Sequence, residues 1–390
     1  RKTTTYAPDD TTGAVPTYLR PVTYTQGPVR VGATLLYEDG EKVTFTDVAA
    51  GDNFTLALDS RGRVWSWGDN AYWSWLIQTK NPFGAAKDES EELPVLNYHG
   101  EPVKDSGRAL IGKLGRTSAN NGDDWVDPLP GLVLVGEDQV LGEGTISIIS
   151  EDGYDLADQP DPIVSIAAGK NFAMALSRSG RVYTWGLDNY GQLGQGEEFD
   201  KPNSTYAQTV VKGSSPSSTG SEMSDVVAIA AGSETAYAIR SNGDLWTWGS
   251  NSSTYVDEEG VERRTVTGQL GAGIQDLYRD APIRASRGMS PQSADKVEYI
   301  NRVVSVAAGD GHAVVLRSDS KDEFNGGVYG FGSNSHGQIG NHVSNNDFSG
   351  VPIPLVQNGG QHVAAGGKST LAQAPYPAVD GAMTLLAWGD

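Results

Sequence analysis

Histidine and carboxylate side chains are the groups in this 390-residue chain that could catalyse a reaction or bind a metal. The five histidines show no metal-ligand spacing, such as His-x-x-x-His with an acid nearby. The chain has no cysteine, which excludes thiolate ligands, a thiol nucleophile and disulfides. The acidic loop from Asp152 to Asp155 does not have the spacing of a calcium loop. We therefore predict no metal site and no cofactor.

Sequence motifs of common enzyme classes are missing as well. There is no Gly-x-Ser-x-Gly nucleophile turn, no phosphate-binding glycine loop and no dinucleotide fingerprint. The 49 acidic residues are so numerous that some pair must lie close together by chance, so paired acids indicate nothing here. We predict no catalytic residue and a protein that is not an enzyme.

The chain is strongly acidic, with 29 Lys and Arg against 49 Asp and Glu and a net charge of −20. Such a surface repels phosphate backbones, so we predict no nucleic-acid partner. No apolar run approaches the roughly 18 residues that a membrane helix needs, so we predict no membrane insertion. The first residue is Arg1 rather than Met, so we expect a processed, excised or partial chain.

An apolar stretch that ends in Ala-Ala-Gly occurs five times and organises the chain. The residues after it alternate with a period of two, which predicts a strand. A tight turn containing glycine follows, and then a second strand with an aromatic residue just before a glycine. The five motifs close at Gly51, Gly169, Gly232, Gly309 and Gly366. The aromatic position is held by Trp67, Trp185, Trp248, Phe331 and Trp388, which we predict to pack between neighbouring sheets.

A third element, Gly-Gln-Leu-Gly or Gly-Gln-Ile-Gly, begins at Gly191, Gly268 and Gly337. A related Gly-Lys-Leu-Gly at Gly112 lies far downstream of Trp67, as if a long insertion separated the two. Taken together, these motifs resemble the regulator-of-chromosome-condensation repeat family, in a bacterial or viral member. The resemblance covers nearly the whole chain and implies a β-propeller with four-stranded blades around a central channel.

We therefore predict one all-β domain over residues 1–390, a β-propeller of five repeats closed by the N- and C-terminal segments. The segment from Thr11 resembles the outer strands that the last repeat lacks before Asp390, and joining them would remove exposed sheet edges. Seven blades, the usual number in the family, is the alternative. Long insertions are predicted near 71–111 and 252–267, the second as a solvated polar loop.

Two regions are predicted to bind a partner. The positions just after each Ala-Ala-Gly differ between repeats and should line one rim of the propeller. The first insertion carries aromatic residues outside the repeat pattern, which are typical interface anchors, with capping of a hydrophobic end as the alternative. The candidates are Tyr72, Trp73, Trp75 and Phe83 in the insertion, and Asn53, Lys170, Asn171, Glu234 and Lys368 on the rim.

The next position in each repeat is often histidine in the resembling family, and here only His312 keeps it. We expect His312 to be a hydrogen-bonded structural residue rather than a catalyst.

We predict a non-enzymatic structural or protein–protein interaction module, extracellular and exposed on a bacterial cell surface or virion. Its partner would be another protein, such as a neighbouring subunit of a larger assembly. A soluble protein inhibitor and a carbohydrate-binding propeller are the alternatives. Guanine-nucleotide exchange with chromatin docking, which the resemblance implies, needs basic segments that this sequence does not show.

Overall fold

The computed structural model describes residues 2–4, 22–24, 35–73, 95–96, 102–103, 108–110, 112–117, 126–149, 155–196, 203–213, 222–256, 262–290, 293–318, 326–340, 348–375 and 383–390. Throughout these residues the regular structure is β-strand, and no helix there is long and apolar enough to cross a membrane. The chain divides into two compact units, Arg1–Thr44 and Phe45–Asp390. In the first unit, β1 (Lys2–Thr4) pairs with β2 (Val22–Tyr24).

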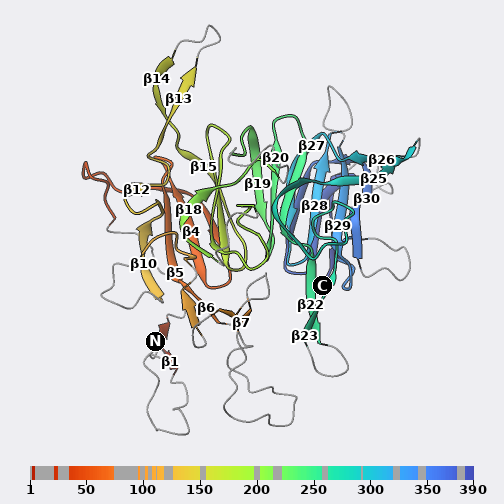
Figure 1. Ribbon diagram of the computed structural model, residues 1–390, viewed down its shortest axis with the longest axis horizontal. Helices are drawn as coiled ribbons and strands as arrows, with labels where there is room; N and C mark the ends of the chain where they lie inside the picture. Colours follow the sequence, from red (N-terminus) through yellow and green to blue (C-terminus); the bar gives the residue numbers. More distant parts are fainter. Residues whose placement is uncertain are drawn as a thin grey trace. The chain divides into compact units, whose positions relative to one another are not determined.

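Five antiparallel sheets follow one another along the second unit (Figure 1). The first contains β3 (Phe45–Ala50), β4 (Phe54–Asp59), β5 (Val64–Asp69) and β10 (Val126–Leu132). The second contains β15 (Ile163–Ala168), β16 (Phe172–Ser177), β17 (Val182–Leu187) and β18 (Asn203–Thr209). The third contains β19 (Val226–Ala231), β20 (Thr235–Arg240), β21 (Leu245–Ser250) and β24 (Tyr278–Arg284).

The last two sheets repeat this order. The fourth contains β27 (Val303–Ala308), β28 (His312–Arg317), β29 (Gly326–Ser333) and β30 (Phe348–Gly360). The fifth has three strands among the described residues, β31 (His362–Gly366), β32 (Ser369–Pro375) and β33 (Met383–Gly389). In every sheet the strand that carries Ala-Ala-Gly lies at one edge and pairs with the strand that follows it.

The five Ala-Ala-Gly strands contact one another in chain order, β3 with β15, β15 with β19, β19 with β27 and β27 with β31. Sheets arranged side by side through their first strands are the blades of a propeller, so the predicted all-β propeller is confirmed. The segment from Thr11, which we predict to complete the last blade, lies outside the described residues except for Val22–Tyr24. Closure by that segment and the total blade number therefore stay predictions.

Both predicted insertions leave the ends of third strands and start as two-stranded ribbons. β6 (Ala71–Trp73) pairs with β9 (Arg108–Leu110), and β7 (Val95–Leu96) pairs with β8 (Pro102–Val103). The second insertion forms the hairpin of β22 (Ser252–Val256) and β23 (Glu262–Val266). The segment predicted as a solvated loop over 252–267 is therefore a hairpin, held by cross-strand pairing and a part-buried arginine, while the side chains of Tyr255, Arg263 and Thr265 are exposed.

Three further ribbons have no counterpart in the sequence prediction. β11 (Leu134–Val135) pairs with β12 (Gln139–Val140), and β13 (Thr145–Ile149) pairs with β14 (Asp155–Pro160), both between the first and second blades. β25 (Ser286–Ser290) pairs with β26 (Ser293–Tyr299) between the third and fourth blades.

The hydrophobic core is divided into layers, each lying between two successive blades. Trp185 and Trp248 are fully buried, and each packs against apolar side chains of the blade before it. Phe331 is equally buried against Tyr237, and Trp388 packs partly buried against the fourth blade. Packing between sheets is thus confirmed for these four. Trp67 in the first blade is half-buried, with its ring 6.5 Å from that of Phe45 in the same blade.

Hydrogen bonds join these layers to the Gly-Gln-Leu-Gly turns. The indole Nε1 of Trp185 donates to the carbonyl of Lys113 at 3.1 Å, and that of Trp248 donates to the carbonyl of Gln192 at 3.0 Å. Phe331 has no such donor, and the hydroxyl of Tyr237 donates to the corresponding carbonyl of Gln269 instead, at 2.7 Å. A buried carbonyl thus keeps a donor even where the repeat residue cannot provide one.

The glycine of Ala-Ala-Gly is required by space in the first four blades. A Cβ added at Gly169 would lie 2.1 Å from the Phe172 ring and 2.6 Å from the carbonyl oxygen of Gly232 in the next blade. Gly51 and Gly309 have equivalent neighbours, an aromatic ring at 2.0 and 2.3 Å and a carbonyl oxygen of the next blade at 2.6 Å. Gly366 in the fifth blade has nothing within 4 Å of an added Cβ.

We predict that Gly169→Ala lowers the free energy of unfolding by about 2 to 4 kcal/mol, because ring and backbone must both move to admit one methyl group. Gly366→Ala is the matched control, since it makes the same change at the same repeat position with open space around it. Urea unfolding followed by tryptophan fluorescence measures both variants. Equal losses would contradict a steric origin and indicate a general effect of the substitution.

A buried acid occupies a repeat position that is otherwise asparagine. Asn70, Asn251 and Asn334 accept a hydrogen bond through Oδ1 from the backbone N–H of the leucine or isoleucine in the turn that follows, each at 3.1 Å. Asp188 accepts the same bond from Leu193 at 2.8 Å. Burial, with Asp280 nearby as a smaller cause, raises the pKa of Asp188 to about 8 against the opposing Leu193 hydrogen bond.

This pKa predicts that the protein loses stability as the pH rises from about 4 to about 8, because the unfolded chain releases the Asp188 proton first. Asp188→Asn keeps the acceptor and removes the titration. It should flatten that pH dependence and raise stability at neutral pH by about 1 kcal/mol or more. Thermal unfolding of both proteins from pH 4.5 to 8.5 measures this, and parallel curves would show that Asp188 is ionised throughout.

Candidate functional site

The turns that follow Ala-Ala-Gly lie at one end of the blades, and we call this end the AAG rim (residues 51–53, 169–171, 232–234, 309–311 and 366–368). Each turn also receives the end of the third strand of its own blade, as where the N–H of Asp69 donates to the carbonyl of Asn53 at 2.8 Å. Both predicted insertions leave third strands at this end. The two regions that the sequence singled out for binding thus share one end of the blades.

Backbone hydrogen bonds join these turns from blade to blade. The N–H of Asp52 donates to the carbonyl of Lys170 at 3.3 Å, and the N–H of Lys170 donates to that of Ser233 at 2.8 Å. The hydroxyl of Ser233 then donates to the carboxylate of Asp310 at 3.1 Å. The N–H of Asp310 donates to the carbonyl of Gly367 at 2.8 Å. The rim turns are therefore linked in series across the five blades, through backbone groups at three junctions and through the side chains of Ser233 and Asp310 at the fourth.

Charged side chains of both signs stand on this backbone. Lys170 and Asp52 lie 3.9 Å apart, with side chains 49% and 50% exposed. Lys368 is exposed and places its Nζ 3.1 Å from the imidazole Nε2 of His336. At this exposure an ion pair contributes little to stability, so its members can exchange one partner for another at small cost.

Two of the predicted rim residues are engaged inside the protein. Asn171 is buried, and its Oδ1 accepts a hydrogen bond from Lys113 Nζ at 3.3 Å. The same ammonium group donates to Asp69 at 3.3 Å and lies 6.0 Å from the centre of the Phe54 ring. Lys113 thus ties the first blade to the second, and it stands where the other repeats carry glutamine. That departure from the repeat was the signal from which the sequence could have identified it.

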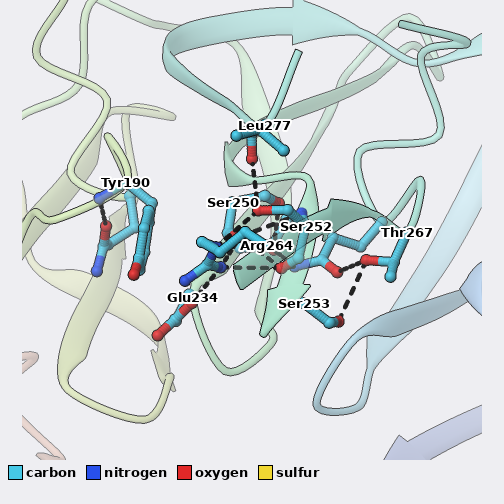
Figure 2. Close-up of polar contacts among 11 residues, drawn as sticks. Tyr190, Glu234, Ser250, Ser252, Ser253, Arg264, Thr267 and Leu277 are labelled. Carbon is cyan, nitrogen blue, oxygen red and sulfur yellow. Dashed lines mark hydrogen bonds and ion pairs between the residues drawn. The ribbon is translucent and has the colours of Figure 1, made fainter. Parts of the chain in front are cut away.

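Glu234 belongs to a cluster built around Arg264 of the β22–β23 hairpin (Figure 2). Arg264 Nη2 donates to Glu234 at 3.1 Å and to the Ser250 hydroxyl and Ser252 carbonyl at 2.9 Å each. Its guanidinium carbon lies 3.7 Å from the centre of the Tyr190 ring, which comes from the second blade. The side chain of Arg264 is 18% exposed.

The Arg264 cluster fixes the hairpin to the rim. A nearly desolvated guanidinium that stacks on an aromatic ring and pairs with a carboxylate holds a defined orientation. The Ser252 hydroxyl continues the network by donating to the carbonyl of Leu277 at 3.0 Å. Sequence reasoning missed Arg264, because an insertion has no repeat counterpart against which a position can be compared, and it missed Tyr190, which stands just before the turn at Gly191.

The predicted insertion residues are described only in part. Tyr72 and Trp73 lie on β6, where they pair with Ala109 and Arg108 of β9. Trp75 and Phe83 lie outside the described residues. Partner binding by these four residues stays a prediction, as it does for Asn171, Glu234 and the exposed rim residues Asn53, Lys170 and Lys368.

His312 is a structural residue. It is buried, and its Nε2 lies 2.8 Å from the hydroxyl of Thr370 in the next blade. That hydroxyl donates its proton to the carbonyl of Gln338, so it must accept from an Nε2–H of the imidazole. Burial lowers the pKa of His312 to about 4, which keeps the ring neutral at pH 7.

In the part of the chain that the structure describes, no group of three or more histidines and acids could hold a metal ion.

The profile of the regulator of chromosome condensation (RCC1) repeat matches residues 45–72, 163–192, 226–254 and 303–338, and a second profile of the same repeat matches residues 179–239. The four matches of the first profile coincide with the first three strands of the first four blades, and the match of the second profile runs from the third strand of the second blade to the second strand of the third. The fifth blade lies outside the matches and has the same order of its first three strands.

Curated proteins and solved structures agree with this assignment. Human HERC6 is 26% identical in an alignment of 282 residues that covers 66% of this chain and 24% of HERC6. The ultraviolet-B receptor UVR8 of Arabidopsis thaliana is 24% identical in an alignment of 216 residues that covers 53% of this chain and 39% of UVR8. The chain therefore spans well under half of either relative.

The crystal structure of human WBSCR16 superposes with a TM-score of 0.52 at 16% identity, covering 89% of this chain and 62% of that one. At this identity the superposition supports the fold. From its repeated motifs, its matched residues and its blades, the chain contains repeats of the regulator of chromosome condensation (RCC1) type.

Proposed function

We propose that this chain is a non-enzymatic protein–protein interaction module that binds its partner through the AAG rim. The observation that supports this is the linked rim backbone, which carries exposed charges of both signs at repeat-equivalent positions. A backbone-linked rim with variable side chains separates stability from specificity, because at three of the four junctions the side chains can change without loss of the hydrogen bond between blades.

The exposed charges at the rim contribute little to the stability of the fold and are available to contact a partner. The half-exposed pair of Lys170 and Asp52, and the exposed contact of Lys368 with His336, offer both signs to an approaching surface. Complementary charges raise the rate of association and set the register of two proteins. The Arg264 cluster holds the β22–β23 hairpin in a fixed position beside these charges, so the hairpin would form part of the surface that the partner contacts.

Catalysis has no support from the described residues. His312 is neutral and enclosed, and Lys113 is buried against Asp69 and Asn171. RCC1-repeat propellers generally act by binding other proteins rather than by catalysing a reaction. We extend that role to this chain.

The rim proposal predicts that the double variant Lys170→Glu and Lys368→Glu weakens partner binding at least tenfold and leaves the melting temperature unchanged, because both side chains are exposed. The partner is first recovered by purifying the tagged protein from its source and identifying co-eluting proteins by mass spectrometry. Its affinity for each variant is then measured with the purified pair.

Arg178→Glu is the matched control, since Arg178 is exposed at the opposite end of the second blade. It changes the net charge in the same direction without touching the rim. Unchanged affinity of the rim variant would refute binding at the rim and direct attention to the insertion at 71–111. Equal weakening by both variants would indicate a long-range charge effect rather than a contact.

We also propose that the module is exposed on a bacterial cell surface or virion. The absence of cysteine and the acidic surface support this, because a protein with these features does not need a reducing compartment. The expected result is that protease added to intact cells or particles removes the protein while a cytosolic marker remains. Protection of both would refute exposure.

A further inference from the structure

Lys113 is a fully buried amine, with a side chain that is 1% exposed. It lies in the Gly-Lys-Leu-Gly turn that follows the first insertion, where the other repeats carry Gln192, Gln269 and Gln338. A lysine is rarely this buried unless it is paired, because an ammonium group loses its hydration when it leaves water. The groups that surround its Nζ therefore indicate what this lysine can do.

Two side chains of different chemistry lie against the amine. Asp69, the last residue of β5, places Oδ2 3.3 Å from Lys113 Nζ. Asn171, in the rim turn of the second blade, accepts a hydrogen bond from the same nitrogen through Oδ1 at 3.3 Å. Asn171 is buried, and the side chain of Asp69 is largely so. An amine, a carboxylate and a carboxamide therefore share one enclosed site.

An aromatic ring is part of this enclosure. Phe54 is buried, and its ring centre lies 6.0 Å from Lys113 Nζ. Taking an ammonium and a carboxylate out of water is costly, so enclosure makes the neutral pair of amine and carboxylic acid accessible by transfer of one proton. The neutral amine is the nucleophilic form of lysine. A carboxamide that lies against it is then an electrophile within reach.

The acid and the amine both depart from the repeat, and they do so at the same junction of blades. The position of Asp69 is held by Leu187 in the second blade, Ser250 in the third and Ser333 in the fourth. The position of Lys113 is held by glutamine in those three blades. Three blades thus form without either group, so the fold of a blade requires neither of them.

We propose that Lys113 and Asn171 form an amide bond with each other, with Asp69 as the catalytic residue that transfers the protons. Asp69 first accepts a proton from the Lys113 ammonium group. The neutral Nζ then attacks Cγ of Asn171, which forms the new C–N bond. Asp69 transfers protons from Nζ to Nδ2 of Asn171, the Cγ–Nδ2 bond breaks, and ammonia leaves. The ammonia takes up the remaining proton as ammonium, so the carboxylate is restored and no oxidant or other reactant is consumed.

The fold itself supplies what this reaction needs. Folding holds the reacting groups side by side, which replaces a bimolecular encounter by proximity. Burial that keeps Lys113 from a dissolved substrate keeps it against Asn171, so the chain would modify itself once and remain a non-enzymatic module. The amide would join the first blade to the second covalently, in a chain that has no cysteine and so no disulfide. The proposal goes beyond partner binding at the AAG rim and does not depend on it.

Mass spectrometry of the intact chain tests the proposal. We expect the folded protein to be lighter than its sequence by one ammonia. Trypsin does not cleave after an acylated lysine, so a digest should contain one branched species that joins the peptides of Lys113 and Asn171. Folded natural protein that keeps the full mass of its sequence after prolonged incubation would overturn the proposal.

Two variants remove the reacting groups by restoring residues that other repeats carry, so both should fold. Lys113→Gln removes the nucleophile, and Asp69→Ser removes the group that transfers protons. Both variants should keep the full mass of their sequences, and trypsin should cleave after Lys113 in Asp69→Ser. Circular dichroism verifies that the strand content is unchanged. Formation of the branched species in Asp69→Ser as fast as in the natural protein would refute the role of Asp69.

The Lys113→Gln variant is also the control for another source of the mass change. An asparagine followed by glycine, such as Asn242, can lose ammonia by forming a succinimide. An ammonia loss that persists in Lys113→Gln would have this origin and would overturn the proposal. The rim variant with Lys170→Glu and Lys368→Glu should form the amide normally, so failure of the amide and failure of the rim are distinguishable.

Discussion

The close approach of neighbouring blades at their Ala-Ala-Gly strands is the constraint on which the rest of the structure depends. A carbonyl oxygen of one blade occupies the space that a side chain would need in the blade before it, from Gly51 through Gly309. This contact brings the following turns within hydrogen-bonding distance of one another. The linked rim, its pattern of exposed charges and the burial of Asn171 all follow from it.

Much of the fold could be predicted from the sequence because the same motifs recur in several repeats, each time at the same structural position. The alternating strand pattern, the aromatic before glycine and the separated Gly-Lys-Leu-Gly each recur, and the structure places them at equivalent points. Agreement among copies makes a short motif informative. The inserted ribbons escaped prediction for the same reason, since each occurs once and its strands are short and polar.

The candidate site residues, too, could be predicted from the sequence only where they occupy repeated positions. The repeated positions predicted which residues lie on the rim. They do not predict which of these residues form hydrogen bonds or ion pairs with other parts of the protein. Asn171 and Glu234 are held by Lys113 and Arg264, and both of those partners are distant in the sequence.

The hydrogen bonds between the core layers also have a direction. The indole of Trp185 reaches back to Lys113, that of Trp248 to Gln192, and the hydroxyl of Thr370 to Gln338, in each case from a later blade to an earlier one. A ribosome delivers the earlier blade first. For these three bonds the acceptor is therefore already in place when its donor emerges, which favours assembly of successive blades in order during synthesis.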